Sequence, residues 1–402
     1  MKRSTAEVSV QGIGFYVHVP FCRHLCPYCD FYKMELRDRP ARARLDFPGQ
    51  VQREMELLLA VYPELEGRPL ETVYFGGGTP STLVPEAVGA LLSWWLAAFP
   101  RSPGPEITLE ANPENLTENR ARKWHDAGIT RLSIGAQSFH PRELELLERL
   151  HVRETIVEAV HRSRRAGFAN LSLDLMFGLP GQTLERWMEN LRRAVDLGPD
   201  HVSFYGLTWH EGTPFEAQRR RGRLVELDDG LQADMYLGGA EFLVANGFEH
   251  YEISNFARPG CRSRHNARYW TGQDVIGLGP GAHSRDGEER WRNPEDLDGW
   301  ASALAAGQLP RTSVERPGML EAAWERLFTG LRRAEGLRVR EDPELTAVCR
   351  KWREANLPEA ARWMEAGPDT VRLTREGWLL SDAILGGLIL DLPADTPHSS
   401  LQ

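Results

Sequence analysis

The sequence predicts an α/β fold built around a partial barrel of six strand–helix units, a (β/α)6 arrangement two units short of a closed barrel. From about residue 13 to residue 208, short runs of β-favouring residues alternate with amphipathic stretches of helical period. This alternation is typical of parallel strands joined by right-handed helical crossovers. Each expected strand is also followed by glycine, proline or polar residues. An α+β extension and a mainly helical C-terminal domain, for which a winged-helix-like arrangement is one candidate, complete the prediction.

Six strands and five helices account for the first half of the chain. The expected strands are Phe15–Val19, Thr72–Phe75, Glu106–Leu109, Arg131–Ile134, Leu171–Leu175 and His201–Tyr205. The expected helices are Val51–Val61, Pro85–Ala98, Thr117–Ala127, Thr155–Ala166 and Leu184–Leu197. Capping residues support these boundaries, because Thr117 begins one helix, Gly128 follows it and Gly167 ends the next.

The residues that follow the strands are expected to gather at one rim, because functional groups in such barrels lie at the C-terminal ends of the strands. The segments concerned are the cysteine-containing loop after the first strand, Gly76–Pro80, Glu110–Pro113, Gly135–Ser138, Asp174 with Gly178–Pro180, and Gly206–Thr208. The sequence therefore predicts a functional site at this rim.

The second half of the chain has a different pattern. We expect a helix over 227–246, a strand over 251–256, a segment rich in Gly, Arg and aromatic residues over 258–284, helices over 319–333 and 357–366, a hairpin over 371–380 and an apolar run over 384–390. The expected domains are an N-terminal extension (1–12), the partial barrel (13–210), its extension (211–290), the C-terminal domain (291–390) and a polar tail (391–402).

Composition restricts the possible functions. With 41% hydrophobic and 26% charged residues among 402, the chain is typical of a soluble globular protein. It has no apolar run of the ~18 residues that a membrane-spanning helix needs, and its N-terminus lacks an apolar signal core, so we expect a cytoplasmic protein. A formal charge of −9 argues against a nucleic-acid partner. DNA binding by the C-terminal domain is a less favoured alternative to a structural role.

Three of the five cysteines, Cys22, Cys26 and Cys29, have the spacing C-x3-C-x2-C. Thiolates are the ligands of iron–sulfur clusters, and three of them leave one iron of a four-iron cube open to a small molecule. A structural zinc site, with His18 or His24 as the fourth ligand, is the main alternative. Zinc ligands usually come as two separated pairs, and no second pair is present. A disulfide framework is disfavoured in a long chain with few cysteines.

The cysteine motif, with Tyr28 before its last cysteine, resembles the signature of the radical S-adenosylmethionine (SAM) superfamily. The string YVHVPFCRHLCPYC resembles one branch of it, the oxygen-independent coproporphyrinogen III oxidases and their relatives. The resemblance implies a [4Fe–4S] cluster on Cys22, Cys26 and Cys29, with SAM on the open iron. The cofactor supplies the chemistry, while the protein positions it.

Further strings, namely YFGGGTPS, LEANPEN, RLSIGAQSF, LDLMFGLPGQT and VSFYGLT, resemble the same branch. The SAM-binding residues that the resemblance implies are Tyr16, Tyr28, Gly77, Gly78, Thr79, Glu110, Gln137, Arg149, Asp174 and Gly206. Each has an ordinary alternative: the glycine loop can be a plain turn, the carboxylates can cap helices or pair with arginines, and Arg149 can face solvent. Their shared place at the strand ends favours the binding role.

Two positions separate the members of this branch. The oxidases resemble C-x3-C-x2-C-x-C, whereas this chain has Phe31 at the fourth cysteine position, and a phenyl group has no lone pair to donate. The string HNARYW, from His265 to Trp270, resembles the HNxxYW motif of the heme chaperones in the branch. Imidazole is a common axial ligand of heme iron, so the resemblance implies heme binding by His265.

Other residues near this motif can contribute to heme binding. Guanidinium groups match carboxylates in bidentate pairs, so Arg262, Arg264 and Arg268 are candidates to bind the propionates. Cys261 and His283 are alternative iron ligands. The ordinary alternative is that His265 is a hydrogen-bonded loop histidine and that the aromatic residues belong to the core.

The leading hypothesis from the sequence is a heme chaperone that binds heme, a [4Fe–4S] cluster and SAM, and transfers heme to an acceptor protein whose identity the sequence does not reveal. The electron donor of the cluster is likewise unidentified. The alternative is a radical SAM enzyme that acts on a porphyrinogen, as a coproporphyrinogen III dehydrogenase, or on another substrate. A zinc-stabilised protein without a redox role is the third reading.

Overall fold

The computed structural model describes residues 11–390, and the chain divides into two compact units. Unit 1 comprises Met1–Ala136, Leu147–Leu171 and Gln273–Glu315. Unit 2 comprises Gln137–Leu146, Ser172–Gly272 and Arg316–Gln402. The expected tail over 391–402, and all but two residues of the expected extension over 1–12, lie outside the described residues. No helix within residues 11–390 has the length and apolar character that a membrane crossing requires.

Unit 1 contains a sheet with the strand order β14-β13-β12-β11-β1-β4-β5-β6. Its strands are β1 Ile13–Val19, β4 Leu70–Gly77, β5 Arg101–Ala111, β6 Arg131–Gln137, β11 Val275–Leu278, β12 His283–Asp286, β13 Glu289–Arg292 and β14 Ser313–Glu315. Strand β1 lies between β4 and β11, and the pairs β1–β4, β4–β5, β5–β6 and β1–β11 are parallel. Strands β11 to β14 continue as antiparallel neighbours. The parallel strands are those that the alternation predicted, apart from β11.

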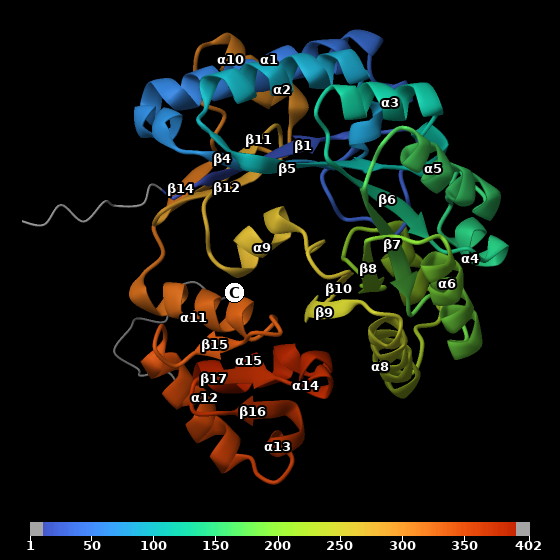
Figure 1. Cartoon of the computed structure of the whole chain (residues 1–402), viewed down its shortest axis with the longest axis vertical. Helices are drawn as coiled ribbons and strands as arrows, with labels where there is room; N and C mark the ends of the chain where they lie inside the picture. The colour runs from blue at the N-terminus through green and yellow to red at the C-terminus, as the bar shows by residue number, and fades with distance from the viewer. Residues whose placement is uncertain (1–10, 391–402) are drawn as a thin grey trace, which may run out of the picture. The chain divides into compact units, whose positions relative to one another are not determined.

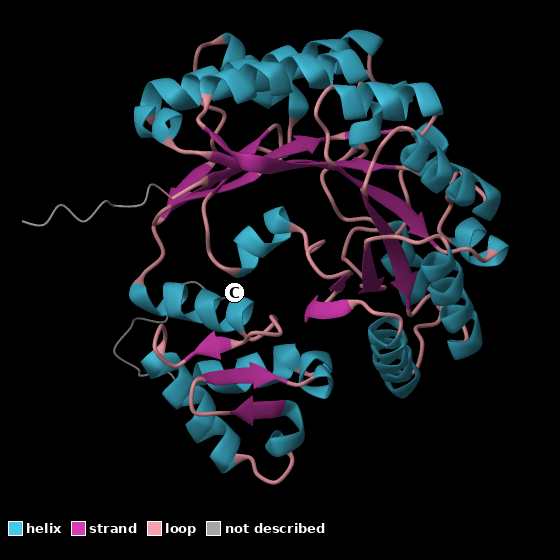
Figure 2. Cartoon of the chain, in the orientation of Figure 1, coloured by secondary structure: helices cyan, strands magenta, loops and turns pink. Residues whose placement is uncertain are grey.

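Helices cover one face of this sheet (Figures 1 and 2). They are α1 Ala41–Val61, α2 Pro85–Ala98, α3 Glu118–Asp126, α5 Arg153–Arg165 and α10 Leu297–Ala305, with 3-10 turns at Leu36–Asp38, Pro63–Gly67, Pro80–Thr82 and Pro113–Asn115. A short parallel pair, β2 Phe21–Cys22 and β3 Met34–Glu35, flanks the cysteine loop. The sheet packs on the helices through aromatic side chains, because Phe15 of β1 contacts Trp95 of α2 edge-on at 5.4 Å and Phe99 at 4.9 Å.

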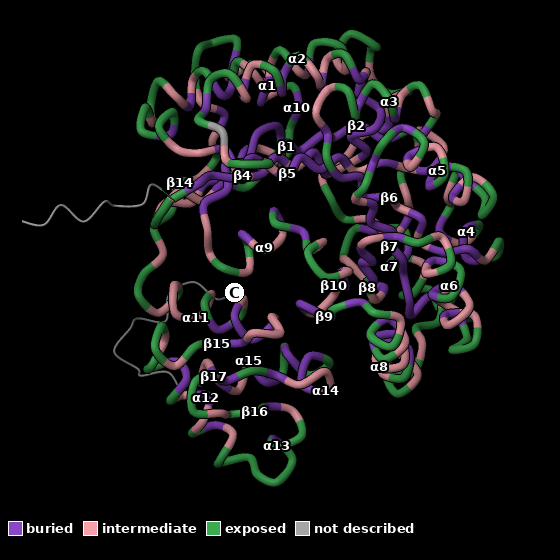
Figure 3. Tube along the Cα trace, in the orientation of Figure 1, coloured by how far each residue is buried: buried purple, intermediate pink, exposed green. Residues whose placement is uncertain are grey.

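Unit 2 contains the parallel pair β7 and β8, followed by the antiparallel strands β10 and β9. The strands are β7 Asn170–Phe177, β8 His201–Gly206, β9 Glu249–Glu252 and β10 Asn255–Ala257, and the helices are α4 Pro141–Leu146, α6 Leu184–Asp196, α7 Pro214–Arg220, α8 Asp229–Ala245 and α9 Arg264–Trp270. Phe204 of β8 lies at the centre of the core, with ring centroids 5.6 Å from Phe177 and 5.4 Å from Trp187. The strands are largely buried along their length (Figure 3).

The C-terminal part of unit 2 contains a three-stranded antiparallel sheet with the order β15-β17-β16. Its elements are α11 Met319–Gly330, β15 Leu337–Arg338, α12 Pro343–Ala355, α13 Ala360–Trp363, β16 Met364–Ala366, β17 Thr370–Leu373, α14 Arg375–Leu379 and α15 Ser381–Leu390. The succession helix, strand, helix, helix, strand, strand fits the winged-helix-like expectation for this part of the chain.

Several predicted elements in the second half were wrong. The expected hairpin 371–380 does not form, because β17 ends at Leu373 and the Thr374 side chain caps α14 by accepting a hydrogen bond from the Gly377 backbone N–H. Strand β17 pairs with β15 and with β16, and β16 lies within the expected helix 357–366. The expected strand 251–256 is two strands, β9 and β10, and the region after Trp291 includes β14 besides helices. The local sequence pattern did not predict these short strands, because pairing with other strands stabilises them.

Glu54 of α1 is a buried carboxylate that holds the segment after β11. Its Oε2 atom accepts hydrogen bonds from the Gly279 backbone N–H at 2.7 Å and from the Trp300 indole at 3.0 Å. Its Oε1 atom accepts one from Asn293 Nδ2 at 2.5 Å. Burial raises the pKa of Glu54 to about 7 in spite of these donors. Gly279 approaches the end of β1 so closely that a Cβ there would lie 2.5 Å from the carbonyl oxygen of His18.

The raised pKa of Glu54 predicts that the protein loses stability as the pH rises from about 4.5 to about 7. In this range the native state retains a proton that the unfolded chain has lost, so the free energy of unfolding falls with increasing pH. The rise in pKa from 4.5 to about 7 corresponds to about 3 kcal/mol. Urea unfolding at several pH values should show a flatter pH dependence for Glu54→Gln, with the exposed Glu56→Gln as the control. The same pH dependence in wild type and Glu54→Gln would contradict this assignment.

Candidate functional site

The cysteine loop follows β1 and lies against the loop that follows β4. Cys22 is 6% exposed, and Cys26 and Cys29 are half-buried. The Thr79 hydroxyl is 3.5 Å from Cys22 Sγ. Burial raises the pKa of the Cys22 thiol to about 11, so this thiol is protonated at neutral pH until a metal replaces the proton. Lys33 partly offsets the burial that raises the pKa of Cys29.

The glycine loop at 76–78 allows the cysteine loop to come close. The Gly78 backbone N–H donates to the Val19 carbonyl at 2.8 Å. A Cβ on Gly78 would lie 2.8 Å from that carbonyl oxygen and 3.0 Å from Cys22 Sγ, so a larger residue would push the two loops apart. Gly77 adopts φ +103°, in the left-handed region that favours glycine. Both glycines are therefore required by the backbone, whether or not they also contact a ligand.

Aromatic and carboxylate groups from β1, β4 and β5 contact one another. The Tyr74 hydroxyl donates to Glu110 Oε1 at 2.7 Å, and the rings of Tyr16 and Tyr74 stack at 6.2 Å. His18 Nε2 donates to the Tyr32 carbonyl at 2.7 Å, which leaves Nδ1 to accept from the Tyr16 hydroxyl at 3.2 Å. Burial lowers the pKa of His18, which favours this neutral form. Both ring nitrogens of this suggested zinc ligand are thus already engaged.

The other suggested zinc ligand is also paired. His24 Nε2 lies 2.9 Å from Glu148 Oε2. Within residues 11–390, no three His, Cys, Asp or Glu side chains are arranged to hold a single metal ion. A four-iron cube makes a different demand, because its three cysteines bind three different iron atoms.

Arg149 is placed beside the cysteine loop and does not face solvent. Its guanidinium donates to Cys26 Sγ at 3.3 Å, to Asn112 Oδ1 at 2.6 Å and to the Gly135 carbonyl at 3.1 Å. Its Nε atom is buried and has no hydrogen-bond partner among residues 11–390. A small, shallow pocket adjoins this arginine, and its lining residues are Arg23, His24, Cys26, Asn112, Glu114, Glu148, Arg149 and Leu150.

These contacts fit a cluster whose sulfurs carry negative charge. The donor set near the cysteines consists of a hydroxyl, an arginine and a lysine, and hydrogen bonds or positive charge next to a thiolate stabilise it. Tyr28 also lies close to Cys26 and Arg149, and burial raises the pKa of its phenol above the ordinary value. The residues present are therefore suited to an iron–sulfur cluster.

Four of the predicted residues belong to unit 2. Gln137 ends β6 with φ 62°, a left-handed conformation that is uncommon for a residue with a side chain. The turn that follows is held by Glu143 of α4, whose Oε2 atom accepts hydrogen bonds from Ser138 Oγ (2.7 Å), Asn190 Nδ2 (2.9 Å) and Gln182 Nε2 (3.1 Å). All four of these side chains are at most 3% exposed. The strained turn is thus fixed by a buried polar cluster, which we call the Glu143 cluster.

Asp174 of β7 ends a chain of hydrogen bonds that reaches α9. Ser172 Oγ donates to Asp174 Oδ1 at 3.3 Å and lies 2.8 Å from His201 Nδ1. His201 Nε2 lies 2.8 Å from Tyr251 Oη, which accepts from the Ser263 backbone N–H at 3.3 Å. When His201 is neutral and carries its proton on Nδ1, each group in this series of hydrogen bonds donates to the next one. The series then runs in one direction, from the Ser263 backbone N–H to the Asp174 carboxylate. Such aligned hydrogen bonds strengthen one another.

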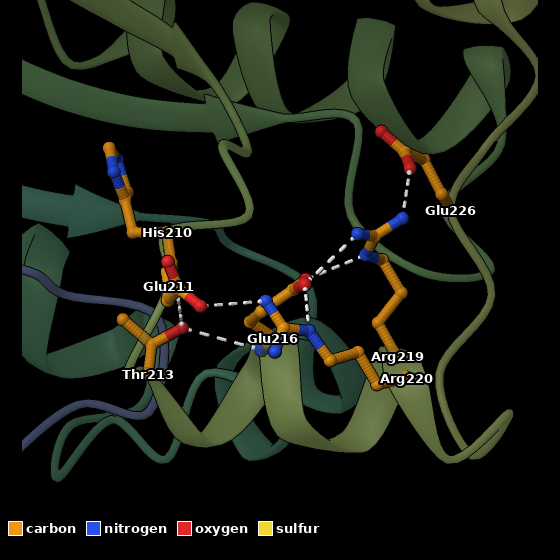
Figure 4. A network of polar contacts seen from close by, with 7 residues as sticks. All are labelled: His210, Glu211, Thr213, Glu216, Arg219, Arg220 and Glu226. Atoms are coloured by element: carbon orange, nitrogen blue, oxygen red, sulfur yellow. Dashed lines mark hydrogen bonds and ion pairs between the residues drawn. The ribbon is translucent and has the colours of Figure 1, made fainter. Parts of the chain in front are cut away.

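Gly206 ends β8, and a polar network fixes the segment that follows it (Figure 4). A Cβ on Gly206 would lie 3.1 Å from the Phe177 ring. In the network, Glu216 accepts hydrogen bonds from Arg219 at 2.7 Å and from Arg220 at 2.8 Å. Arg219 and then Arg220 lower the pKa of Glu216 to about 2. Thr213 caps the same helix, α7, by accepting from the Glu216 backbone N–H.

The HNxxYW segment forms α9, with Ser263 as its N-cap. His265 is 1% exposed, and its Nε2 atom lies 3.1 Å from Tyr269 Oη. Arg262 pairs with Glu249 at 3.0 Å and with Glu335 at 2.6 Å.

The remaining candidates around α9 differ in exposure. Arg268 is 2% exposed, whereas Arg264 is exposed and Cys261 is half-buried. Of the three arginines considered for heme propionates, Arg262 and Arg264 are thus exposed and Arg268 is buried. His283 is an exposed residue of β12 in unit 1.

The assigned residues thus fall into two groups. Unit 1 brings together the three cysteines, Tyr16, Tyr28, Gly77, Gly78, Thr79, Glu110 and Arg149, whereas Gln137, Asp174, Gly206 and His265 belong to unit 2. Sequence reasoning missed the supporting residues, above all Glu143 and His201. Two members of the Glu143 cluster, Ser138 and Gln182, lie within the strings RLSIGAQSF and LDLMFGLPGQT. The sequence analysis interpreted these strings only as ligand-binding segments and did not predict a structural role for them.

The Glu143 cluster predicts a strong dependence of stability on one carboxylate. Glu143→Ala would remove the acceptor that three buried donors share, and the expected loss in free energy of unfolding is about 3 kcal/mol. Chemical unfolding should show this loss, while Glu145→Ala, an exposed position on the same helix, should stay within about 0.5 kcal/mol of wild type. Equal stability of the two variants would show that the cluster does not hold the turn.

Comparisons with known proteins identify the relatives of this chain. The profile described as "Radical SAM superfamily" matches residues 16–194. The chain is 32% identical to the heme chaperone HemW of Bacillus subtilis, over 94% of this chain and 99% of that protein. It is 36% identical to HemW of Mycobacterium tuberculosis, over 96% of each chain. It is also 36% identical to the mouse mitochondrial radical S-adenosyl methionine domain-containing protein 1, over 94% of this chain and 87% of that one.

The fold is likewise shared with a solved structure. Coproporphyrinogen III oxidase (HemN) from Escherichia coli superposes with a TM-score of 0.79 at 22% identity, over 95% of this chain and 91% of that one. The predicted fold class is therefore confirmed as mixed α/β with a large, mainly parallel sheet of the radical SAM type. The resemblance that the cysteine and strand-end motifs suggested is also confirmed: this chain belongs to the HemW family within the radical SAM superfamily.

Proposed function

We propose that this protein is a heme chaperone that binds heme, a [4Fe–4S] cluster and SAM, and transfers heme to an acceptor protein. The observation that carries the proposal is similarity at 32–36% identity, over nearly the full chain, to proteins named heme chaperone HemW. The similarity includes the C-terminal half of the chain and is not confined to the radical SAM segment at 16–194.

The cluster is proposed to bind Cys22, Cys26 and Cys29, and when bound it supplies one electron for cleavage of SAM. The protein's part is to keep the thiolates charged and the site shielded. Arg149 offers a hydrogen bond to Cys26, and Thr79 offers one to Cys22. Hydrogen bonds to sulfur lower the energy of the negatively charged ligands and tune the potential of a cluster.

SAM is proposed to bind through Tyr16, Tyr28, Gly77, Gly78, Thr79, Glu110, Gln137, Arg149, Asp174 and Gly206. The carboxylates Glu110 and Asp174 suit its ammonium and ribose hydroxyls, and Arg149 suits its carboxylate. Arg149 has a buried Nε atom with no hydrogen-bond partner among residues 11–390, which leaves it a donor for such an anion. Heme is proposed to bind at α9, where the resemblance to the heme chaperones implies a role for His265.

A coproporphyrinogen oxidase activity is less well supported. The E. coli oxidase shares the fold at 22% identity, but the motif that the oxidases resemble has a fourth cysteine where this chain has Phe31. Phe31 is 62% exposed, and its ring has no lone pair for a metal and no hydrogen to donate. Chemistry that requires a thiol at this position is unavailable to this chain.

The partners and compartment follow from the same proposal. Iron-binding thiols need reducing surroundings, and we infer a cytoplasmic location. A heme acceptor and an electron donor are required, and we expect both to be proteins. We expect no nucleic-acid partner, because the net charge is −9.

The cluster assignment is tested by chemical analysis of anaerobically purified protein. Wild type should contain about four irons and four sulfides per chain. Cys22→Ala, Cys26→Ala and Cys29→Ala should each lose most of both, whereas Cys261→Ser should retain them, because Cys261 lies outside the cysteine loop. Stoichiometric zinc without sulfide would eliminate both the chaperone and the enzyme hypotheses.

The chaperone function is tested by heme transfer. Protein loaded with heme should pass it to an apo-hemoprotein faster than heme dissociates into a nonspecific scavenger, and incubation with SAM, reductant and coproporphyrinogen should leave the propionates intact. Heme titration of His265→Ala should show a lower affinity than wild type. Protoporphyrinogen formed at enzymatic rates would favour the oxidase instead, and failure of wild type to bind heme would refute the chaperone function.

A further inference from the structure

The histidine and the tyrosine of α9 differ sharply in exposure. His265 is 1% exposed, whereas Tyr269 is 46% exposed. The two residues are four positions apart and so lie on one face of the helix. Their ring centroids are 5.3 Å apart, and the rings are nearly perpendicular, at 81°. A large planar molecule that arrives from solvent therefore meets the tyrosine before the histidine.

The hydrogen bond between them occupies the histidine nitrogen. His265 Nε2 and Tyr269 Oη are 3.1 Å apart. In the imidazole tautomer that carries its proton on Nδ1, Nε2 accepts a hydrogen bond from the Tyr269 hydroxyl. The lone pair that accepts this hydrogen bond is the one that iron would need. Ligation of iron by His265 Nε2 therefore requires the hydrogen bond to break and the ring to leave its buried position.

The start of α9 is anchored, which opposes such a movement. The Ser263 backbone N–H is bonded to Tyr251 Oη at 3.3 Å, and the Ser263 hydroxyl accepts from the Asn266 backbone N–H at 3.2 Å. Ser263 is 0% exposed, and Arg268, on the next turn, is 2% exposed. Exposure of His265 would disturb these buried contacts, whereas Tyr269 needs no movement of the helix to meet a ligand.

We propose, on the basis of the heme-binding function above, that Tyr269 Oη is the axial ligand of ferric heme and that His265 is the buried acceptor of its proton. As the iron–oxygen bond forms, the O–H bond breaks and its proton passes to His265 Nε2. The iron remains ferric, so no electron is transferred and no further reactant is needed. Tyrosine is a known heme ligand, as in catalase. His265 then orients the ligand oxygen and stabilises its charge, as partners of metal ligands commonly do.

The arrangement also provides a means of release. Phenolate is a hard oxygen ligand that suits ferric iron better than the softer ferrous iron. Reduction of bound heme should therefore weaken its attachment to Tyr269. A chaperone with such a ligand would hold ferric heme and give it up more readily once a one-electron reductant, such as a redox protein, has converted the iron to the ferrous state.

The experiment is a ferric heme titration of the full-length protein, monitored by visible absorption and resonance Raman spectroscopy. The variants are Tyr269→Phe, His265→Ala and the conservative His265→Gln, with Tyr205→Phe as the matched control because Tyr205 is 43% exposed in the same unit. Wild type should show a phenolate-to-iron charge-transfer band. Tyr269→Phe should lose this band and roughly 100-fold or more in affinity, and His265→Ala should keep the band with about 10- to 100-fold weaker binding.

The conservative variant and the control sharpen the comparison. His265→Gln should fall between wild type and His265→Ala, because an amide oxygen can accept the hydrogen bond, and Tyr205→Phe should match wild type. Dithionite should accelerate heme loss from wild type.

Three other results would overturn the assignment of Tyr269 as the heme ligand. If Tyr269→Phe keeps the wild-type spectrum while His265→Ala loses it, His265 is the ligand and our proposal is overturned. If both variants keep the spectrum and affinity, the iron ligand lies outside this pair, which also overturns it but leaves heme binding intact. If wild type binds no heme, the proposed chaperone function fails together with this inference. Circular dichroism of each variant distinguishes a lost ligand from a lost fold.

Discussion

The parallel pairing of β1 with β4 is the constraint on which the site in unit 1 depends. The register places Val19 opposite Gly77, so the two strands end side by side and the loops that follow them begin together. The Gly78 N–H then bonds to the Val19 carbonyl, and Thr79 reaches Cys22. A side chain on Gly78 would meet both Val19 and Cys22, so the cysteine loop holds its place only beside bare backbone. The glycine motif and the cysteine motif are far apart in the sequence, but in the structure they form a single feature.

Both units hold their polar residues with buried hydrogen-bond acceptors. In unit 1, Glu54 fixes the segment after β11, and in unit 2, Glu143 fixes the turn after Gln137. A buried carboxylate that satisfies several donors makes its segment costly to displace, because each donor left without an acceptor destabilises the fold. This rigidity is what residues near a cofactor need, since small displacements of a ligand-binding group weaken its interactions. The buried carboxylates thus hold neighbouring segments in place without being predicted ligand-binding residues themselves.

The sequence predicted the strands of the barrel and their polar ends because hydrophobic period and capping are local properties. It predicted less where tertiary pairing decides the outcome. Strand β11 is a buried four-residue run, VIGL, that joins β1 in the sheet, and no local pattern distinguishes it from a loop. The burial of His265 was likewise out of reach, because the motif gives residue types but not exposure. The left-handed conformation of Gln137 could not be read from a residue that has no special preference for it.

The roles within the strings that resemble the radical SAM family follow from exposure and hydrogen bonding. In RLSIGAQSF, Gln137 is half-buried at the strand end, whereas the adjacent Ser138 is 0% exposed and bonded to Glu143. In HNARYW, Tyr269 is exposed and bonded to the buried His265. Each string thus pairs a residue that can reach a ligand with one that holds it in place. A motif lists residue types without their exposure, so it does not say which residue is placed to contact a ligand, and the pattern of burial adds that information.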